Sequence, residues 1–214
     1  MREEEGQFHR SGDVKHETEV FSRVLLEDSK RKKYQQIPRD KRYVLHWGQR
    51  KLLLSEIEFL TLYGEQGDLM VYAGAAPGTH IPFLSELFPK HRFELWDPSP
   101  FAIQPSSKIK IMNDFFTMEV CKDYVERKED ILFVSDIRTA NAALQQLEES
   151  NKYIEKDNHL QRDWVLALNP KKAMLKFRFP YCPGKADYFD GEIRLPCWGF
   201  VRPFPFTKSN LIFE

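Results

Sequence analysis

The strongest constraint on the fold is the stretch Leu69–His80, LMVYAGAAPGTH, in which an apolar run leads directly into a glycine-containing loop. The run Leu69–Tyr72 predicts a short buried strand, and the apolar segment Ile81–Phe88 predicts a helix beyond the loop. In a strand–loop–helix unit, backbone N–H groups face a ligand, and the missing Cβ of Gly74 permits a close approach. A turn that merely connects the two elements is the alternative.

The glycine spacing of this loop excludes two common phosphate-binding motifs. It is not the G-x-G-x-x-G of dinucleotide-binding proteins, and no Gly-Lys-Ser or Gly-Lys-Thr follows, so it is not a P-loop. What remains is a loop suited to a nucleoside-bearing ligand that need not carry a pyrophosphate. S-adenosylmethionine fits that description.

The balance of charges limits the functions that the whole chain can have. The 214 residues include 32 Lys and Arg against 32 Asp and Glu, so the formal net charge is zero. Bulk charge therefore does not indicate a nucleic-acid-binding protein, and any basic surface must be local. The length suits one α/β domain with an additional arm.

Cysteine usage and hydropathy predict a soluble, intracellular protein. Cys121, Cys182 and Cys197 include no C-x-x-C pair, which argues against a disulfide scaffold or a zinc site. The N-terminus has no apolar signal segment, and no apolar run is long enough to span a bilayer. We therefore expect a reducing compartment, no membrane and no metal.

Composition divides the chain into a charged N-terminal arm, residues 1–42, and a domain, residues 43–214. In the arm, acidic residues lead and a basic cluster follows at Lys30–Lys33. The arm is either a solvated, partly disordered segment or a basic segment that lies along a polyanion or a partner.

Strands alternate with helices along the domain. Apolar spacing predicts helices over Gly48–Tyr63 and Ala140–Leu168. Apolar runs predict further strands at Arg92–Trp96, Lys108–Met112, Ile131–Arg138, Ala173–Phe179 and Glu192–Leu195. This order predicts an α/β fold with a doubly wound, mostly parallel sheet whose antiparallel edge comes from the C-terminal strands.

Two predicted strands end in residues suited to a nucleoside. Asp97 lies 23 residues after Gly74, and one carboxylate at such a strand end can accept both hydroxyls of a ribose. After the next strand, Phe115 or Phe116 could pack against an adenine, with Asp114 near its amine. Core packing of both phenylalanines is the alternative.

Four charged residues stand where neutral ones are expected. Lys51 lies in the first turn of a helix, Asp136 ends a buried strand, Lys176 interrupts a strand and Glu192 begins one. A partly desolvated lysine beside a second cation can take part in proton transfer near neutral pH, and can activate a sugar hydroxyl. Two unrelated salt bridges are the alternative.

Five short segments resemble, in the same order and at similar intervals, the poxviral cap-specific mRNA 2′-O-methyltransferases: Gly48–Leu54, Tyr72–His80, Ser135–Arg138, Leu168–Pro170 and Leu175–Arg178. The resemblance covers about Gly48 to Leu195. It implies a Rossmann-like, S-adenosylmethionine-dependent methyltransferase fold, a Lys-Asp-Lys-Glu tetrad and a homologue from another large DNA virus.

The resemblance assigns roles to individual residues. The tetrad becomes Lys51, Asp136, Lys176 and Glu192, with Lys176 activating the ribose 2′-hydroxyl. The S-adenosylmethionine site is implied to comprise Gln49, Tyr72, Gly74, Ala75, Ala76, Pro77, Gly78, Thr79, His80, Asp97, Asp114, Phe115, Phe116 and Asp136.

The resemblance also suggests how RNA is held. Tyr181 matches a cap-stacking aromatic, since 7-methylguanine is cationic and favours an electron-rich ring. Arg138 and Arg178 are candidate RNA contacts, whereas Pro183 stands where the poxviral enzymes carry an acid. The expected substrate is the first transcribed nucleotide of capped mRNA.

Alternative functions remain open at this point. The chain could methylate uncapped or ribosomal RNA, or be a non-catalytic subunit that binds RNA or a polymerase. Expected partners are capped mRNA and a viral poly(A) polymerase or another capping or transcription subunit. The expected location is the host cytoplasm or the virion.

Overall fold

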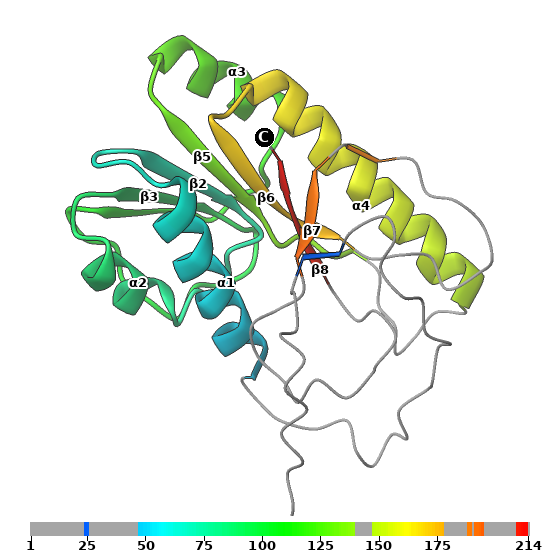
Figure 1. Cartoon of the computed structure of the whole chain (residues 1–214), viewed down its shortest axis with the longest axis horizontal. Helices are drawn as coiled ribbons and strands as arrows, with labels where there is room; N and C mark the ends of the chain where they lie inside the picture. The colour runs from blue at the N-terminus through cyan, green and yellow to red at the C-terminus, as the bar shows by residue number, and fades with distance from the viewer. Residues whose placement is uncertain are drawn as a thin grey trace, which may run out of the picture.

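A single sheet with helices on both faces forms the body of the protein (Figure 1). The computed structural model describes residues 24–25, 47–139, 147–177, 188–189, 191–194 and 209–213. No helix in this part of the chain has the length and apolar character needed to cross a membrane.

Five parallel strands make the centre of the sheet: β2 (Leu69–Ala73), β3 (Arg92–Trp96), β4 (Ile109–Met112), β5 (Ile131–Ser135) and β6 (Lys172–Phe177). They lie in the order β4-β3-β2-β5-β6, and each neighbouring pair is parallel. Every residue of β2 and β5 is buried, as expected for strands that are covered on both faces. The predicted α/β class and parallel sheet are confirmed.

Three antiparallel strands extend the sheet beyond β6: β8 (Ser209–Phe213), β7 (Glu192–Arg194) and β1 (Val24–Leu25). They pair in the order β6-β8-β7-β1. The predicted antiparallel C-terminal edge is therefore confirmed. β1 belongs to this edge although composition assigned its residues to the arm, because a two-residue strand carries no periodic signal. The rest of the arm, residues 1–23 and 26–42, lies outside the described residues.

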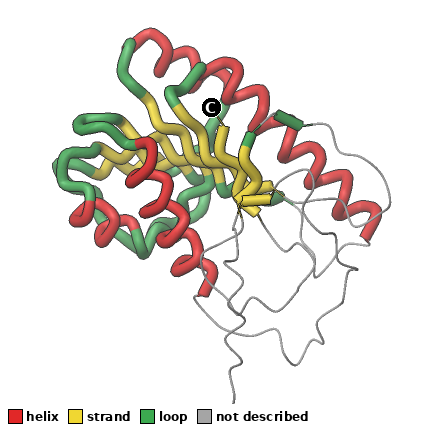
Figure 2. Tube along the Cα trace, viewed as in Figure 1, coloured by secondary structure: helices red, strands yellow, loops and turns green. Residues whose placement is uncertain are grey.

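Helices pack on the sheet in two pairs, one on each face (Figure 2). α1 (Trp47–Tyr63) and α2 (Ile81–Leu87) share a core with one face, and α3 (Met118–Arg127) and α4 (Leu147–Leu168) share a core with the other. Successive residues of β2 alternate between these cores, which is the two-residue period of a strand.

The helix boundaries agree with the sequence in part. Both α1 and α2 match their predicted segments within one residue, whereas α3 was not predicted. α3 is ten residues long, mostly polar, and buries only Cys121 and Tyr124, so it contains few apolar residues to mark it in the sequence. α4 begins at Leu147, and residues 140–146 of the predicted helix lie outside the described residues. It ends before Asn169, whose φ of 46° is left-handed.

The order of the strands predicts a ligand-binding crevice at the carboxyl end of the sheet. From β2 the chain passes to β3 on one side, and β5 lies on the other side of β2. Open α/β sheets bind ligands at such a reversal of strand order, outside the carboxyl ends of the strands. The loop that follows β2 and the segment that follows β5 meet there, since the N–H of Asp136 donates to the carbonyl of Ala73 at 3.0 Å.

Candidate active site

Gly74 is required by the protein itself at this crevice. Its φ is 82°, and a Cβ at this position would lie 2.9 Å from the backbone nitrogen of Ile137. The sequence-based interpretation attributed the glycine to close approach by a ligand. The contact that a side chain would make is instead with the segment after β5, so Gly74 lets the ends of β2 and β5 lie together.

Asp97 fastens the glycine loop to the end of β3. Its Oδ2 accepts the N–H of Ala76 at 3.1 Å, and its Oδ1 accepts the N–H of Ser99 at 2.8 Å. The carbonyl of Trp96 accepts the N–H of Gly74 at 2.8 Å. Asp97 is half-buried, and a carboxylate oxygen can accept more than one hydrogen bond. It can therefore hold the loop and still accept hydroxyl groups of a ligand.

The other loop residues differ in what they contact. Ala75 is buried and Ala76 is half-buried, whereas Pro77 and Thr79 are exposed. The buried Gly78 has a φ of 68°, and a Cβ there would lie 3.3 Å from side-chain atoms of both Phe101 and Ile103.

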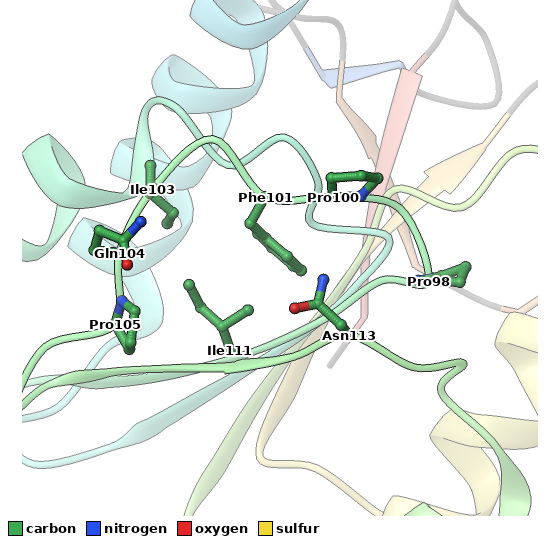
Figure 3. Close-up of a pocket in the computed structure, with 8 residues that line it drawn as sticks. All are labelled: Pro98, Pro100, Phe101, Ile103, Gln104, Pro105, Ile111 and Asn113. Atoms are coloured by element: carbon green, nitrogen blue, oxygen red, sulfur yellow. The ribbon is translucent and has the colours of Figure 1, made fainter.

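A cavity of about 530 Å³ opens next to this loop, at the carboxyl ends of β3 and β4 (Figure 3). Its volume lies in the range of small-molecule sites, and its walls combine apolar side chains with the polar groups of Gln104 and Asn113. Sequence reasoning missed the cavity because the proline-rich connection from β3 to β4 reads only as a loop. The lining residues are Pro98, Pro100, Phe101, Ile103, Gln104, Pro105, Ile111 and Asn113.

The two phenylalanines after β4 have different environments. Phe115 is 66% exposed, and its N–H donates to the exposed Asp114 at 2.7 Å. Phe116 is 7% exposed and packs in the core, edge-on to Trp96 and Trp164 and stacked on Tyr124. The structure thus assigns Phe116 to the core rather than to an adenine, because aromatic neighbours surround its ring.

A buried polar chain connects the glycine loop with α1. Gln49 Oε1 accepts a hydrogen bond from Thr79 Oγ1 at 3.3 Å and lies 2.8 Å from His80 Nδ1. The other ring nitrogen, His80 Nε2, lies 2.8 Å from Glu56 Oε2 and 3.0 Å from Glu56 Oε1. Glu56 is fully buried. This chain fixes the side chain of Gln49 over the start of α2.

Tyr72 lies under the same network. Its side chain is fully buried in the core shared with α1 and α2. Burial raises its pKa well above the ordinary value, and the nearby charges of Glu56, Asp136 and Asp97 raise it further. The phenol therefore stays neutral. The Tyr72 ring has no exposed surface with which to contact a ligand.

Asp136 and Lys176 form an ion pair at the mouth of the crevice. Lys176 Nζ lies 2.6 Å from Asp136 Oδ1 and donates to the Asp136 carbonyl at 3.0 Å. The lysine side chain is 9% exposed and the aspartate side chain 21% exposed. The two side chains are thus largely shielded from water and hold each other in one orientation, as a group that aligns a reacting atom must be held.

The other two predicted tetrad residues are not joined to this pair by any contact within the described residues. Lys51 is half-buried on α1. Glu192 pairs with Arg194, and Arg194 Nη1 also lies 3.2 Å from Glu58 Oε1 on α1. Sequence reasoning missed Arg194, because this contact spans 136 positions and follows no local pattern.

Strand register nevertheless places Lys176, Arg194 and Glu192 on one face of the sheet. Lys176 is opposite Asn210 on β8, and Asn210 is opposite Arg194 on β7. Directly opposed residues share a face, and so do residues two apart on a strand, which adds Glu192 to this face.

The candidate RNA contacts are only partly described. Arg138 Nη1 lies 3.7 Å from Asp157 Oδ2, and the arginine side chain is 15% exposed. Arg138 thus faces α4, which does not match its expected role at an RNA surface. Arg178, Tyr181 and Pro183 lie outside the described residues.

Comparisons with known proteins agree with the motifs. The chain is 29% identical over 179 residues to the cap-specific mRNA (nucleoside-2′-O-)-methyltransferase of fowlpox virus (strain NVSL), covering 76% of this chain and 56% of that protein. It is also 29% identical over 150 residues to the protein of the same name from myxoma virus (strain Lausanne), covering 64% and 43%. The chain thus spans about half the length of these relatives. The resemblance to poxviral proteins is confirmed.

A solved structure, that of a mutant of MtNAS, is similar with a TM-score of 0.36 and 14% identity, over 78% of this chain and 60% of that chain. That likeness is too weak to carry a conclusion. The model of one protein family, described as poly A polymerase regulatory subunit, matches residues 21–196. This match covers most of the chain, and the protein belongs to the poly(A) polymerase regulatory subunit family.

Proposed function

We propose that this protein is an S-adenosylmethionine-dependent RNA methyltransferase that acts on the ribose 2′-hydroxyl of the first transcribed nucleotide of capped mRNA. The observation that carries the proposal is the ion pair of Lys176 and Asp136, which opens to the crevice beside the glycine loop. The names of the poxviral relatives supply the substrate class.

The residues around the crevice fit the methyl donor. Asp97, half-buried at the end of β3, would accept the ribose hydroxyls, and the adjoining cavity has room for the adenine. The loop Gly74–Gly78 would lie along the nucleoside, and Gln49 would face the methionine end. Exposed Phe115 would cover the base. When bound, the donor supplies an electrophilic methyl group on a sulfonium.

Lys176 is the residue that would act on the acceptor. Asp136 holds its Nζ through both the carboxylate and the main-chain carbonyl, so the nitrogen has one fixed place. From there Nζ would orient the 2′-hydroxyl and, in its neutral amine form, take the hydroxyl proton as the oxygen bonds to the methyl carbon and the methyl–sulfur bond breaks. Alignment of the two reacting atoms and removal of one proton are the main contributions that a protein can make to such a displacement.

Lys51 and Glu192 would complete the tetrad. Glu192 shares a face of the sheet with Lys176, and α1, which carries Lys51, covers that face. Arg194 links Glu192 to α1 through Glu58, so these residues would set the charge around the acceptor ribose.

Transfer of a labelled methyl group to capped RNA tests the proposal. Lys176→Ala is expected to lower the rate at least about 100-fold, the usual contribution of a positioned acid–base group. Lys122→Ala, an exposed lysine on α3, is the matched control and should keep full activity. Absence of transfer to capped RNA by the unaltered protein would refute the proposal.

Equal rates on capped and uncapped oligonucleotides would indicate that the substrate is uncapped or ribosomal RNA. If calorimetry shows no binding of S-adenosylmethionine, the protein is instead a non-catalytic subunit that binds RNA or a polymerase.

The description of the family favours a second role beside catalysis, as a subunit of a viral poly(A) polymerase or of another capping or transcription complex. Co-elution of the two purified proteins on size exclusion is the expected result. Either role would place the protein in the host cytoplasm or in the virion. Fractionation of infected cells and of purified particles tests this placement.

A further inference from the structure

Strands β5 and β6 stop pairing with each other one residue before Asp136 and Lys176. The last paired residues of β5 and β6 are Ser135 and Leu175. The peptide groups of the next residues must find other partners, since unpaired buried peptide groups are costly. The N–H of Asp136 donates to Ala73 on β2, and the register of β5 with β6 ends at Leu175, one residue before Lys176.

Gln161 of α4 pairs with the main chain of Lys176. Its Oε1 accepts the N–H of Lys176 at 3.2 Å, and its Nε2 donates to the carbonyl of Lys176 at 3.2 Å. The amide thereby pairs with both peptide groups of one residue, as a neighbouring strand would do. Nε2 also donates to the carbonyl of Asp157 at 3.3 Å, and Gln161 is fully buried.

Asp157 holds the segment that follows Asp136. Its Oδ2 accepts the N–H of Thr139 at 3.0 Å, and its Oδ1 accepts the Thr139 hydroxyl at 2.7 Å. Asp157 is 1% exposed and lies four residues before Gln161, so both side chains project from the same face of α4.

We propose that Asp157 and Gln161 are positioning residues that fix the main chains carrying Asp136 and Lys176, and so set the contact between the two reactive side chains. This inference rests on the function proposed above. One face of α4 forms hydrogen bonds with both the segment after Asp136 and the main chain of Lys176. A shift of either one would move Lys176 Nζ away from Asp136 Oδ1. Displacements of about 1 Å at reacting groups can cost about 100-fold in rate.

The test is a set of variants assayed for methyl transfer, donor binding and stability. Gln161→Met keeps the size of the side chain but neither hydrogen bond. We expect kcat to fall by about 10- to 100-fold, whereas KM for RNA and the donor affinity measured by calorimetry stay within about twofold. Thr139→Val, which removes one donor to Asp157, should lower kcat, and Thr139→Ser, which keeps it, should restore kcat.

Ile154→Ala is the matched control for lost stability. Ile154 is 4% exposed on α4 and, being apolar, takes no part in the hydrogen bonds to either segment, so this variant should unfold more easily but keep the kcat of the unaltered protein. Wild-type kcat in Gln161→Met, or an equal loss of kcat in Ile154→Ala, would overturn the inference.

A second measurement separates this inference from the proposed function. Hydrogen exchange of the Lys176 amide reports on its bond to Gln161 without any catalysis, and exchange should be at least about tenfold faster in Gln161→Met than in Ile154→Ala. If the unaltered protein transfers no methyl group, the proposed function fails while this comparison still decides the positioning role. Equal exchange in the two variants would contradict it.

Discussion

Gly74 lies directly against Ile137, so that a Cβ on the glycine would stand 2.9 Å from the Ile137 nitrogen and 3.1 Å from the carbonyl carbon of Asp136. The contact joins the loop after β2 to the segment after β5. Those two segments carry the proposed donor loop and the partner of Lys176. The geometry of the loop and that of the ion pair therefore depend on one another.

Replacement of Gly74 by alanine should reduce both stability and donor binding. The left-handed φ of 82° costs a residue with a Cβ about 1–2 kcal/mol, and the contact with the Ile137 backbone adds to that strain. We expect the free energy of unfolding, measured in urea, to fall by more than about 2 kcal/mol.

Gly67→Ala is the control for this prediction. Gly67 also has a left-handed φ, of 98°, but nothing lies within 4 Å of a Cβ placed there. It should lose only the conformational part, about 1–2 kcal/mol. Equal losses of stability in the two variants would mean that the backbone of Ile137 can move away from a Cβ at position 74 at little cost.

Glu94→Gln should remove part of the protein's stability at neutral pH. Glu94 is buried on β3 and accepts from Tyr124 Oη at 2.6 Å, Lys110 Nζ at 2.9 Å and Arg127 Nη1 at 2.9 Å. A glutamine offers one acceptor and brings its own donor, so a loss of about 1–3 kcal/mol is expected from thermal or urea unfolding.

The pH dependence gives this prediction a direction. Burial alone would raise the pKa of Glu94, but the hydrogen bonds from Tyr124, Lys110 and Arg127 outweigh it and lower the pKa below its ordinary value of 4.5. A carboxyl with a lowered pKa stabilises the fold above its ordinary pKa and loses that contribution as the pH falls. The stabilities of the variant and the unaltered protein should therefore converge on acidification. A constant difference down to pH 3 or so would contradict this linkage.

The central sheet could be predicted from sequence because buried parallel strands are continuous apolar runs, as in Ile131–Val134. The strand ends were less certain. The predicted strand continued to Arg138, whereas β5 stops at Ser135, because its partner β2 ends at Ala73 and the bond from the Asp136 N–H to the Ala73 carbonyl is the last between the two strands. Hydrogen bonds between distant segments decide such boundaries.

Some buried polar residues did leave a signal in the sequence. Asp157 and Gln161 fall between Ile154, Trp164 and Leu168 at spacings of three and four, which is the apolar stripe of a helix. Glu56 falls between Leu53 and Leu60 in the same way. A polar residue on an apolar stripe must find partners, so these positions could have been singled out. Arg194 left no such signal, since its partner Glu58 is set by tertiary packing alone.

Glu56→Gln should weaken binding of S-adenosylmethionine through the loop. The buried carboxylate holds His80, and His80 lies against Gln49, which is one of the proposed donor contacts. A neutral amide forms weaker hydrogen bonds than a carboxylate, by about half, so the loop should be held less firmly. Calorimetry should show a dissociation constant raised several-fold.

Glu65→Gln serves as the control for Glu56→Gln. Glu65 is exposed after the end of α1 and pairs with Lys171, at the opposite end of the sheet from the loop. Donor affinity should be unchanged in this variant. Unchanged affinity in Glu56→Gln as well would show that Gln49 does not depend on the buried chain.

Substitutions of the neighbours Phe115 and Phe116 should have different effects, the first on donor binding and the second on stability. Phe116→Ala removes a ring packed against Tyr124, Phe133 and Trp164 in the core, so a loss of about 3–5 kcal/mol in the free energy of unfolding is expected. Phe115→Ala removes a ring that is 66% exposed and should change stability by no more than about 0.5 kcal/mol.

Donor binding should respond in the opposite way, because of the two phenylalanines only Phe115 has an exposed ring. Base–aromatic contacts contribute about 1–3 kcal/mol, so Phe115→Ala should raise the dissociation constant for S-adenosylmethionine about 5- to 100-fold. Phe115→Tyr keeps an aromatic ring and should retain most of the affinity. If Phe115→Ala binds the donor as tightly as the unaltered protein does, Phe115 does not cover the base, and the cavity beside Phe101 alone would hold the adenine.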